Sequence, residues 1–248
     1  MLEGSIFTAL SGALSLRRRL DTVANNLSNV STTGFKANRL NFDGVLSEAG
    51  KSRQSGPNDQ ILFPVIKEGF TDHSQGALKK TDRKLDFALQ GAGFFRVQTE
   101  DGEAYTRDGR FHLNPDGTLV DVDGRPVLND NGAPIELSAR DVEVNEAGEL
   151  FVPGSQAPVD RLGVVRAADP QQLEHRGDNL YTSRAGNMQP AENARVTNEH
   201  LEGSNVNTME EMVHMLDLQR SFQSITKAMK SIDEAYSRNA ADLASPGR

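Results

Sequence analysis

The sequence contains no cysteine and no tryptophan among its 248 residues, and only 6% of them are aromatic. The lack of cysteine excludes disulfides, zinc–thiolate sites, iron–sulfur clusters and a cysteine nucleophile. No apolar run approaches the roughly 18 residues that a membrane-spanning helix needs, so we expect no membrane insertion. With 22 glycines and 36% hydrophobic residues, the composition indicates a turn-rich chain. A length of 248 residues allows one large domain or two small ones.

Acidic residues outnumber basic ones, with 35 Asp and Glu against 27 Lys and Arg. The formal net charge is −8, which argues against a general nucleic-acid-binding protein, so we expect no nucleic acid among the partners. The chain starts Met1-Leu2-Glu3, and its first basic residues, Arg17–Arg19, follow the apolar stretch instead of preceding it. This order differs from that of a secretory signal, so we expect that any export proceeds without a cleaved signal peptide.

The first thirty residues carry a heptad pattern. Apolar residues recur every seven positions in two series offset by three, which fills the a and d positions of four heptads. The segment Thr32-Thr33-Gly34 then supplies a stop. We expect a long amphipathic helix whose exposed seam consists of Ile6, Ala9, Ala13, Leu16, Leu20, Val23, Leu27 and Val30.

The C-terminal segment repeats this pattern with alternating spacings of three and four. Asn207 and Glu210 are spaced as a capping box at its start. A second apolar stripe, formed by Met209, Val213 and Leu216, indicates that this helix has more than one neighbour. Its expected seam consists of Met215, Leu218, Phe222, Ile225, Met229, Ile232 and Tyr236.

The middle of the chain has a different pattern. From about residue 85 to 185, short apolar runs are separated by turn sequences such as Asn114-Pro115-Asp116-Gly117 and Asn131-Gly132. Short strands at spacings of about 8–12 residues with hairpin turns are typical of an antiparallel β domain. The predicted fold class is therefore α+β and mainly β, with an antiparallel central domain between amphipathic terminal helices that form a coiled coil on assembly.

We predict three parts in the chain. Residues 1–30 and 206–248 form a terminal helical coiled-coil domain, and residues 85–185 form the antiparallel β domain. Residues 31–84 and 186–205 are expected to be an extended connecting region with weak structure of its own, although Ile61–Ile66 has the composition of a strand. Because an isolated helix of this length is only marginally stable, the terminal helices need partners, in each other or in other chains.

Motifs that suggest a catalytic or ligand site do not meet the requirements of those sites. Gly91-Ala92-Gly93 lacks the third glycine and the following helix of a dinucleotide-binding loop, so we interpret it as a tight turn before a strand. The turns that end at Gly124 and Gly132 lack the end ligands of a calcium loop and are interpreted as hairpin turns. No two of the five histidines have helical metal-ligand spacing, and no nucleophile–base pair is evident. We predict no catalytic residue, no metal, no cofactor and no enzyme activity.

Two features leave alternatives open. The run Arg17–Arg19 is a candidate contact for nucleic acid or lipid, but Leu16 and Leu20 flank it at core positions, which favours a solvated patch beside a helical seam. The heptads are compatible with helices packed inside one globular domain. Their place at both ends of the chain favours helices that pair outside the central domain.

Four segments resemble the signatures of bacterial flagellar rod and hook proteins, in the family's order. They run from Ala24 to Lys36, from Leu85 to Val97, from Tyr105 to Val120 and from Glu202 to Phe222. Length and motif order resemble the proximal-rod F type most, while the distal-rod G type and the hook relatives share every motif. The residues that carry the resemblance include Asn25, Asn26, Leu27, Asn29, Gly34, Phe35, Asp86, Gly91, Gly93, Phe94, Phe95, Asp108, Gly109, Gly117, Gly203, Ser204, Asn205 and Val206.

The resemblance implies a structural subunit of the flagellar basal-body rod in the periplasm. Such subunits are exported unfolded through the flagellar type III apparatus, and their terminal helices, disordered in the monomer, pair into coiled coils on assembly. The implied partners are this export apparatus, other rod subunits (proximal B, C and F types, distal G type) and further copies in a helical array. Rival hypotheses are a transient scaffold or cap of the rod, and a carbohydrate-active periplasmic domain, against which the missing acid/base pair argues.

Overall fold

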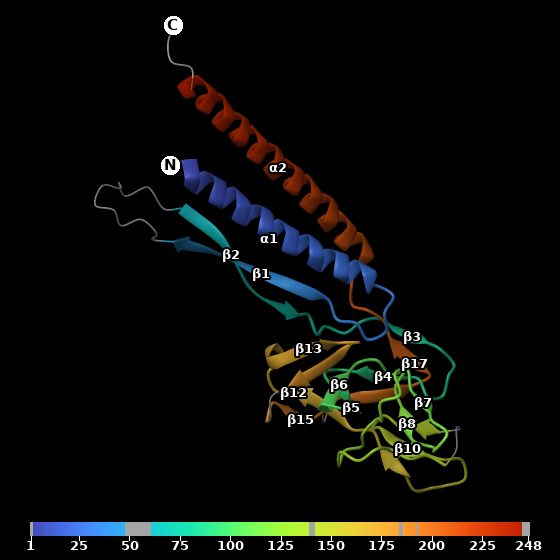
Figure 1. The fold of residues 1–248 in the computed structure, drawn as a ribbon. Helices are drawn as coiled ribbons and strands as arrows, with labels where there is room; N and C mark the ends of the chain where they lie inside the picture. The colour runs from blue at the N-terminus through green and yellow to red at the C-terminus, as the bar shows by residue number, and fades with distance from the viewer. Residues whose placement is uncertain (1, 48–60, 139–141, 184–185, 192, 245–248) are drawn as a thin grey trace. The chain divides into compact units, whose positions relative to one another are not determined.

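The structure is a computed structural model that describes residues 2–47, 61–138, 142–183, 186–191 and 193–244. The chain divides into two compact units (Figure 1). The first, which we call the helical unit, comprises Met1–Ser28, Asn38–Phe70 and Asn207–Arg248. The second, the β unit, comprises Asn29–Ala37 and Thr71–Val206. The prediction of a mainly β fold with antiparallel sheets and helices is confirmed.

The helical unit contains α1 (Leu2–Ser28), α2 (Thr208–Ala244), β1 (Asn38–Ser47) and most of β2 (Ile61–Thr71). β1 and β2 pair as a two-stranded sheet. The sequence predicts an extended connecting region here, with a strand-like composition at Ile61–Ile66, which lies within β2. Helices α1 and α2 lie side by side, and β1 lies along α1 (Figure 1).

Asn207 is the N-cap of α2, as its position in the sequence predicts. Its side-chain oxygen accepts a hydrogen bond from the backbone N–H of Met209 at 3.1 Å. This contact satisfies one of the free N–H groups in the first turn of the helix.

The two helices are antiparallel. Near one end of the pair, the Asn26 Nδ2 atom donates to Glu211 Oε1 at 3.5 Å. Further along, a Cβ atom placed on Gly12 would lie 3.4 Å from Cδ1 of Ile225. The second contact is 14 residues back along α1 and 14 residues forward along α2, so the register between the helices is constant.

The β unit is built around a six-stranded antiparallel sheet with the strand order β13-β14-β6-β5-β12-β15. Central strands β5 and β6 form a hairpin, and a short 3₁₀ helix, η1 (Pro170–Gln172), precedes edge strand β13. The bounds are β5 (Phe94–Thr99), β6 (Gly102–Thr106), β12 (Val164–Ala167), β13 (Leu173–Gly177), β14 (Leu180–Ser183) and β15 (Met188–Pro190).

Smaller sheets complete the β unit. β9 (Glu143–Val144), β10 (Glu149–Phe151) and β11 (Asp160–Arg161) form a three-stranded sheet, and β7 (His112–Leu113) pairs with β8 (Leu119–Val120). The return segment 186–205, which we expected to be extended, also forms paired strands. Its β16 (Arg195–Asn198) pairs with β4 (Phe87–Gln90), and its β17 (His200–Glu202) pairs with β3 (Leu78–Lys80).

The same turn occurs four times in the β unit and confirms the hairpin interpretation. In each turn, the side-chain oxygen of an Asn or Asp accepts hydrogen bonds from the backbone N–H groups two and four residues later. A glycine three residues after the Asn or Asp has a φ between 80° and 85°, which favours glycine. The pairs are Asn114 with Gly117, Asp121 with Gly124, Asn129 with Gly132, and Asn145 with Gly148.

The core of the β unit is a cluster of fully buried aliphatic and aromatic side chains. Phe95 packs edge-on against Phe111 with ring centroids 5.2 Å apart, and the Phe87 ring centroid lies 6.1 Å from that of Phe111. Residues from β4, β5, β10 and β16 contribute to this cluster, so the return segment helps to close the core.

Candidate functional site

The part of the chain that the structure describes contains no candidate metal site. In that part of the chain, no three His, Asp or Glu side chains are placed to hold a metal ion. No described helix has the length and apolar character to cross a bilayer. The sequence signatures meet at two places, which are the candidate functional sites.

The first meeting place lies in the helical unit, where Asn26 joins α1 to β1 and α2. Asn26 exchanges two hydrogen bonds with the backbone of Asn38, at 2.9 and 3.0 Å, and its Nδ2 atom reaches Glu211. The Glu211 carboxylate also accepts from Arg39 Nη1 at 2.9 Å. Asn26 and Glu211 are both 1% exposed. A residue of the N-terminal signature and one of the C-terminal signature thus share one buried polar contact.

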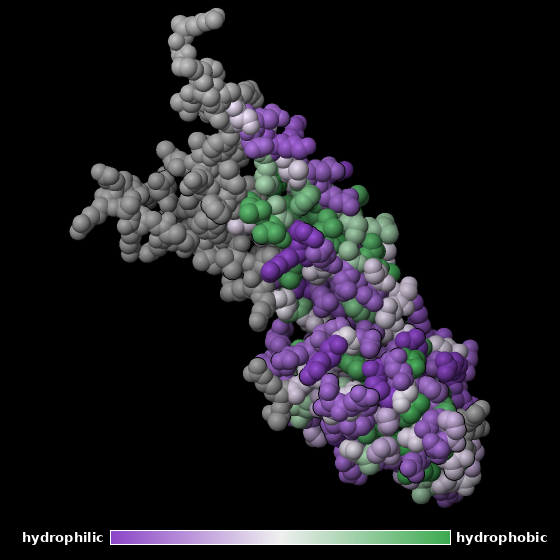
Figure 2. All heavy atoms as spheres, viewed as in Figure 1, coloured by the Kyte–Doolittle hydropathy of each residue, from purple (hydrophilic) through white to green (hydrophobic). Residues whose placement is uncertain are grey.

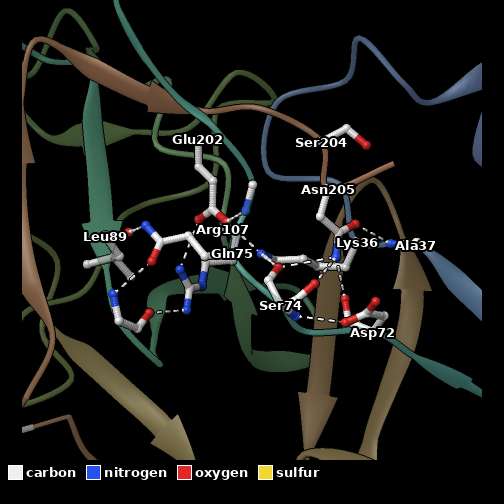
Figure 3. A network of polar contacts seen from close by, with 12 residues as sticks. Lys36, Ala37, Asp72, Ser74, Gln75, Leu89, Arg107, Glu202, Ser204 and Asn205 are labelled. Carbon is white, nitrogen blue, oxygen red and sulfur yellow. Dashed lines mark hydrogen bonds and ion pairs between the residues drawn. The ribbon is translucent and has the colours of Figure 1, made fainter. Parts of the chain in front are cut away.

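The second meeting place is a buried ion network in the β unit (Figure 3). Lys36 Nζ donates to Glu202 Oε1 at 2.6 Å, and Arg107 Nη1 donates to Glu202 Oε2 at 2.9 Å. The Gly76 N–H adds a third hydrogen bond to this carboxylate at 2.8 Å. The three charged side chains are at most 3% exposed. Burial lowers the pKa of Lys36, while the adjacent Glu202 carboxylate acts in the opposite direction.

Asn205 extends this network to the backbone. Its Oδ1 atom accepts from the Ala37 N–H at 2.7 Å, and its Nδ2 atom donates to Asp72 O at 2.8 Å (Figure 3). Next to these contacts, Val206 packs with Phe35 and Ala37 in a small apolar cluster. The segment that follows α1 and the segment that precedes α2 are therefore fixed to each other within the β unit.

Two glycines of the signatures are required by close backbone contacts. Gly34 has a φ of +70°, and a Cβ atom there would lie 2.6 Å from the Arg107 carbonyl carbon. A Cβ atom on Gly109 would lie only 1.7 Å from the Phe87 carbonyl oxygen. No side chain fits at these distances, so both positions need glycine for structural reasons.

Most residues of the two predicted seams are half-buried in the helical unit. Leu16 and Val23 of α1 and Leu218 of α2 line the same groove of about 460 Å³. Ala13, Leu20, Leu27, Met215, Ile225 and Met229 are also half-buried, while Phe222 is 40% exposed. The side chains of Ile6, Ala9, Ile232 and Tyr236 lie outside the described residues.

Val30 requires a correction. The heptad pattern placed it on the seam, but α1 ends at Ser28 and Val30 belongs to the β unit. There it packs against the cluster of Phe35, Ala37 and Val206. The helix ends earlier because the chain turns at Asn29, whose backbone carbonyl accepts from the Thr32 N–H at 3.1 Å.

The buried charges of this network are not predictable from residue type alone. Lys36, Arg107 and Glu202 all lie within the signature segments, but a charged side chain in a sequence is normally solvated. The one sequence feature that could have indicated their burial is a signature glycine nearby. Glu202 directly precedes Gly203, and Arg107 lies two residues before Gly109.

Comparison with known proteins places these features in one class, the flagellar rod and hook proteins. Residues 6–36 match the family "Flagella basal body rod protein", and residues 88–152 match "Flagellar hook protein FlgE/F/G D1 domain". Residues 197–243 match "Flagellar basal body rod FlgEFG protein C-terminal".

Curated relatives extend the match over nearly the whole chain. The flagellar basal-body rod protein FlgF of Caulobacter vibrioides is 36% identical, over 97% of this chain and 98% of the relative. FlgG of Bacillus subtilis is 34% identical (93% and 95%), and FlgF of Rhizobium meliloti is 34% identical (94% and 97%). The chain belongs to the flagellar basal-body rod proteins of the F/G type. These proteins are structural and are not enzymes.

Proposed function

We propose that this protein is a structural subunit of the flagellar basal-body rod and has no catalytic role. The observation that carries this proposal is the match to rod proteins along almost the full length of both chains. The geometry supports it, because buried polar contacts such as Asn26–Glu211 and Lys36–Glu202 tie distant segments of the chain together. Neither of the rival functions, a transient scaffold of the rod or a carbohydrate-active periplasmic domain, is supported by a matching relative.

The proposed assembly elements are α1 and α2. Their seams are only half-buried in the single chain, and α2 carries further apolar residues that are exposed. Burial of such surfaces against neighbouring subunits is a driving force for assembly into a coiled coil, with the ordering of the helices coupled to it. The β unit has its own closed core, so we expect it to fold without neighbouring subunits.

The proposed location is the periplasmic rod, reached through the flagellar type III export apparatus without a cleaved signal peptide. The proposed partners are other rod subunits and further copies of this chain. We favour the proximal-rod F type, since FlgF relatives align over 97–98% of their own length. The distal-rod G type is the alternative, because FlgG of Bacillus subtilis also aligns over 95% of its own length.

The test is recovery from purified basal bodies. In a strain whose own gene is deleted and replaced by a tagged copy, the protein should be found in rods in a fixed ratio to other rod subunits. Motility should be lost on deletion and restored by the copy. Absence from purified rods, with motility intact, would contradict the proposal. A variable, substoichiometric amount would favour the scaffold instead.

A further inference from the structure

One of the four repeated turns of the β unit contains an asparagine directly before its glycine. Asn131 precedes Gly132, and no other Asn-Gly pair occurs in the sequence. At the same position, the other three turns carry Asp116, Asp123 and Ala147. The four turns share one hydrogen-bond pattern and one glycine conformation, so they differ at this position in side-chain chemistry and not in backbone.

The Asn131 side chain is exposed and free. Its amide makes no hydrogen bond within the part of the chain that the structure describes. By contrast, the side-chain oxygen of Asn129 accepts two hydrogen bonds, from the Asn131 and Ala133 N–H groups at 3.0 and 2.9 Å. Asn131 is therefore part of the polar surface of the β unit, one face of which Figure 2 shows, and water has access to it.

We propose that Asn131 is the main site of spontaneous deamidation in this protein, an inference that does not depend on the proposed function. Asparagine is chemically labile, and glycine has no side chain to hinder attack by its backbone nitrogen. The Gly132 nitrogen bonds to Cγ of Asn131, the Cγ–Nδ2 bond breaks, and ammonia leaves with the Gly132 amide proton. Water then opens the resulting succinimide at one of its two carbonyls. The product is either aspartate or isoaspartate, whose main chain runs through Cβ and Cγ.

The other turns should react more slowly. A carboxylate such as that of Asp116 or Asp123 is a poorer electrophile than an amide, and Ala147 offers no group to attack. Within the folded turn, the Gly132 N–H donates to the Asn129 carbonyl at 3.0 Å. The nitrogen is therefore released for attack when the turn opens at the surface, and unfolding should accelerate the reaction.

The two products should differ in their effect on the turn. Aspartate fits at position 131, because Asp116 and Asp123 occupy the same position in their turns. Isoaspartate inserts an additional backbone carbon, which displaces the N–H groups of Gly132 and Ala133 from Asn129. Only the isoaspartate product should therefore disturb the structure.

This turn is also attached to β5, a central strand of the six-stranded sheet. Arg96 of β5 donates from Nη1 to the carbonyl oxygens of Asn129 and Asp130, at 3.2 and 2.9 Å. A Cβ atom on Gly132 would lie 3.1 Å from Arg96 Nη2, so the loop has little room to lengthen. Isoaspartate should weaken this attachment and lower the Tm of the β unit.

Peptide mapping of the purified full-length protein tests the proposal. The folded protein is aged in mildly alkaline buffer, and mass spectrometry follows each asparagine and distinguishes isoaspartate from aspartate. Asn131 should deamidate at least about tenfold faster than any other asparagine, because glycine follows no other asparagine. Asn131→Gln should remove the signal. The matched control is Asp116→Asn, which places an Asn-Gly pair in a second turn and should react within about threefold of Asn131.

Three results would overturn the proposal. Faster deamidation at another asparagine would assign the site elsewhere. If Asn131 stayed intact for as long as the other asparagines, the closed turn would protect it instead of exposing it. If urea did not accelerate the reaction, opening of the turn would not control it.

Calorimetry tests the structural consequence. Asn131→Asp should keep the Tm of the wild type, whereas aged protein that carries isoaspartate should unfold at a lower temperature. An unchanged Tm in aged protein with isoaspartate at position 131 would contradict the attachment of this turn through Arg96.

Discussion

Lys36 and Glu202 are 166 residues apart in the sequence and form a fully buried ion pair of 2.6 Å. Lys36 follows α1 by a short turn, and Glu202 ends the last strand before α2. Their contact, with that between Ala37 and Asn205, holds together the two segments that lead to the helices. The core and the buried ion network of the β unit are therefore complete only when residues 200–206, just before α2, are packed against the rest of the unit.

Removing the carboxylate charge from this network should strongly destabilise the β unit. Glu202→Gln leaves Lys36 and Arg107 buried without an anion, which costs about 3–5 kcal/mol of unfolding free energy. Denaturant unfolding, followed by a probe in the β unit, measures the change. Glu146→Gln, which breaks an exposed pair with Arg195, should cost less than about 1 kcal/mol. Similar losses in both variants would refute the structural role of the network.

His73 should make the β unit sensitive to acid. Burial, with Lys36 and Arg107 nearby, lowers the pKa of His73 to about 4 from its ordinary 6.5. The folded state therefore holds His73 neutral, and the unfolded chain binds the additional proton first. This contribution to stability is complete above about pH 6.5 and is lost as the pH falls toward 4.

The control for this pH dependence is His73→Phe, which keeps an aromatic ring beside Phe94 and Tyr181. Unfolding free energy is measured for both proteins at several values between pH 4 and 7. The difference between wild type and variant should shrink or reverse as the pH falls. A difference that stays constant across this range would show that His73 does not titrate on unfolding.

Gly109→Ala should disrupt the β unit. The added Cβ would lie 1.7 Å from the Phe87 carbonyl oxygen, so strand β4 or its neighbour must move, at a cost of about 3 kcal/mol or more. In Gly154→Ala the added Cβ lies in open space, so the only cost is the positive φ at this position. We expect the substitution to lower the unfolding free energy by about 1 kcal/mol. Thermal unfolding of both variants distinguishes these costs, and equal shifts in Tm would contradict the close approach.

A charge in the helical seam should block assembly and spare the β unit. Ile225→Asp places a carboxylate against Gly12, where the helices touch. We expect loss of the protein from basal bodies, with the unfolding transition of the β unit unchanged. Gln223→Asp, at an exposed position two residues earlier, should still be incorporated. Normal incorporation of Ile225→Asp would mean that the seam does not carry assembly.

Local patterns were sufficient to predict much of the fold. The Thr32-Thr33-Gly34 stop placed the end of α1 within a few residues, because helix ends depend on nearby residues. The Asn-x-x-Gly and Asp-x-x-Gly turns of the β unit were equally readable, since each turn is closed by its own side chain.

Long-range relationships were not predictable in the same way. The β1–β2 pair and the strands of the return segment depend on partners elsewhere in the chain. The burial of Lys36 and Glu202 depends on a contact across 166 residues, and neither residue differs in the sequence from a solvated charge. For Val30, the heptad pattern continued past the point where the chain leaves the helix.

Limited proteolysis of the free and the rod-bound protein tests the account most directly, with fragments identified by mass. In the free protein, both terminal helices should be cleaved rapidly while a fragment close to Thr71–Val206 persists. In purified basal bodies, the same helices should resist the protease, because neighbouring subunits cover them. Equal resistance of the helices in both forms would contradict the claim that they become ordered through assembly.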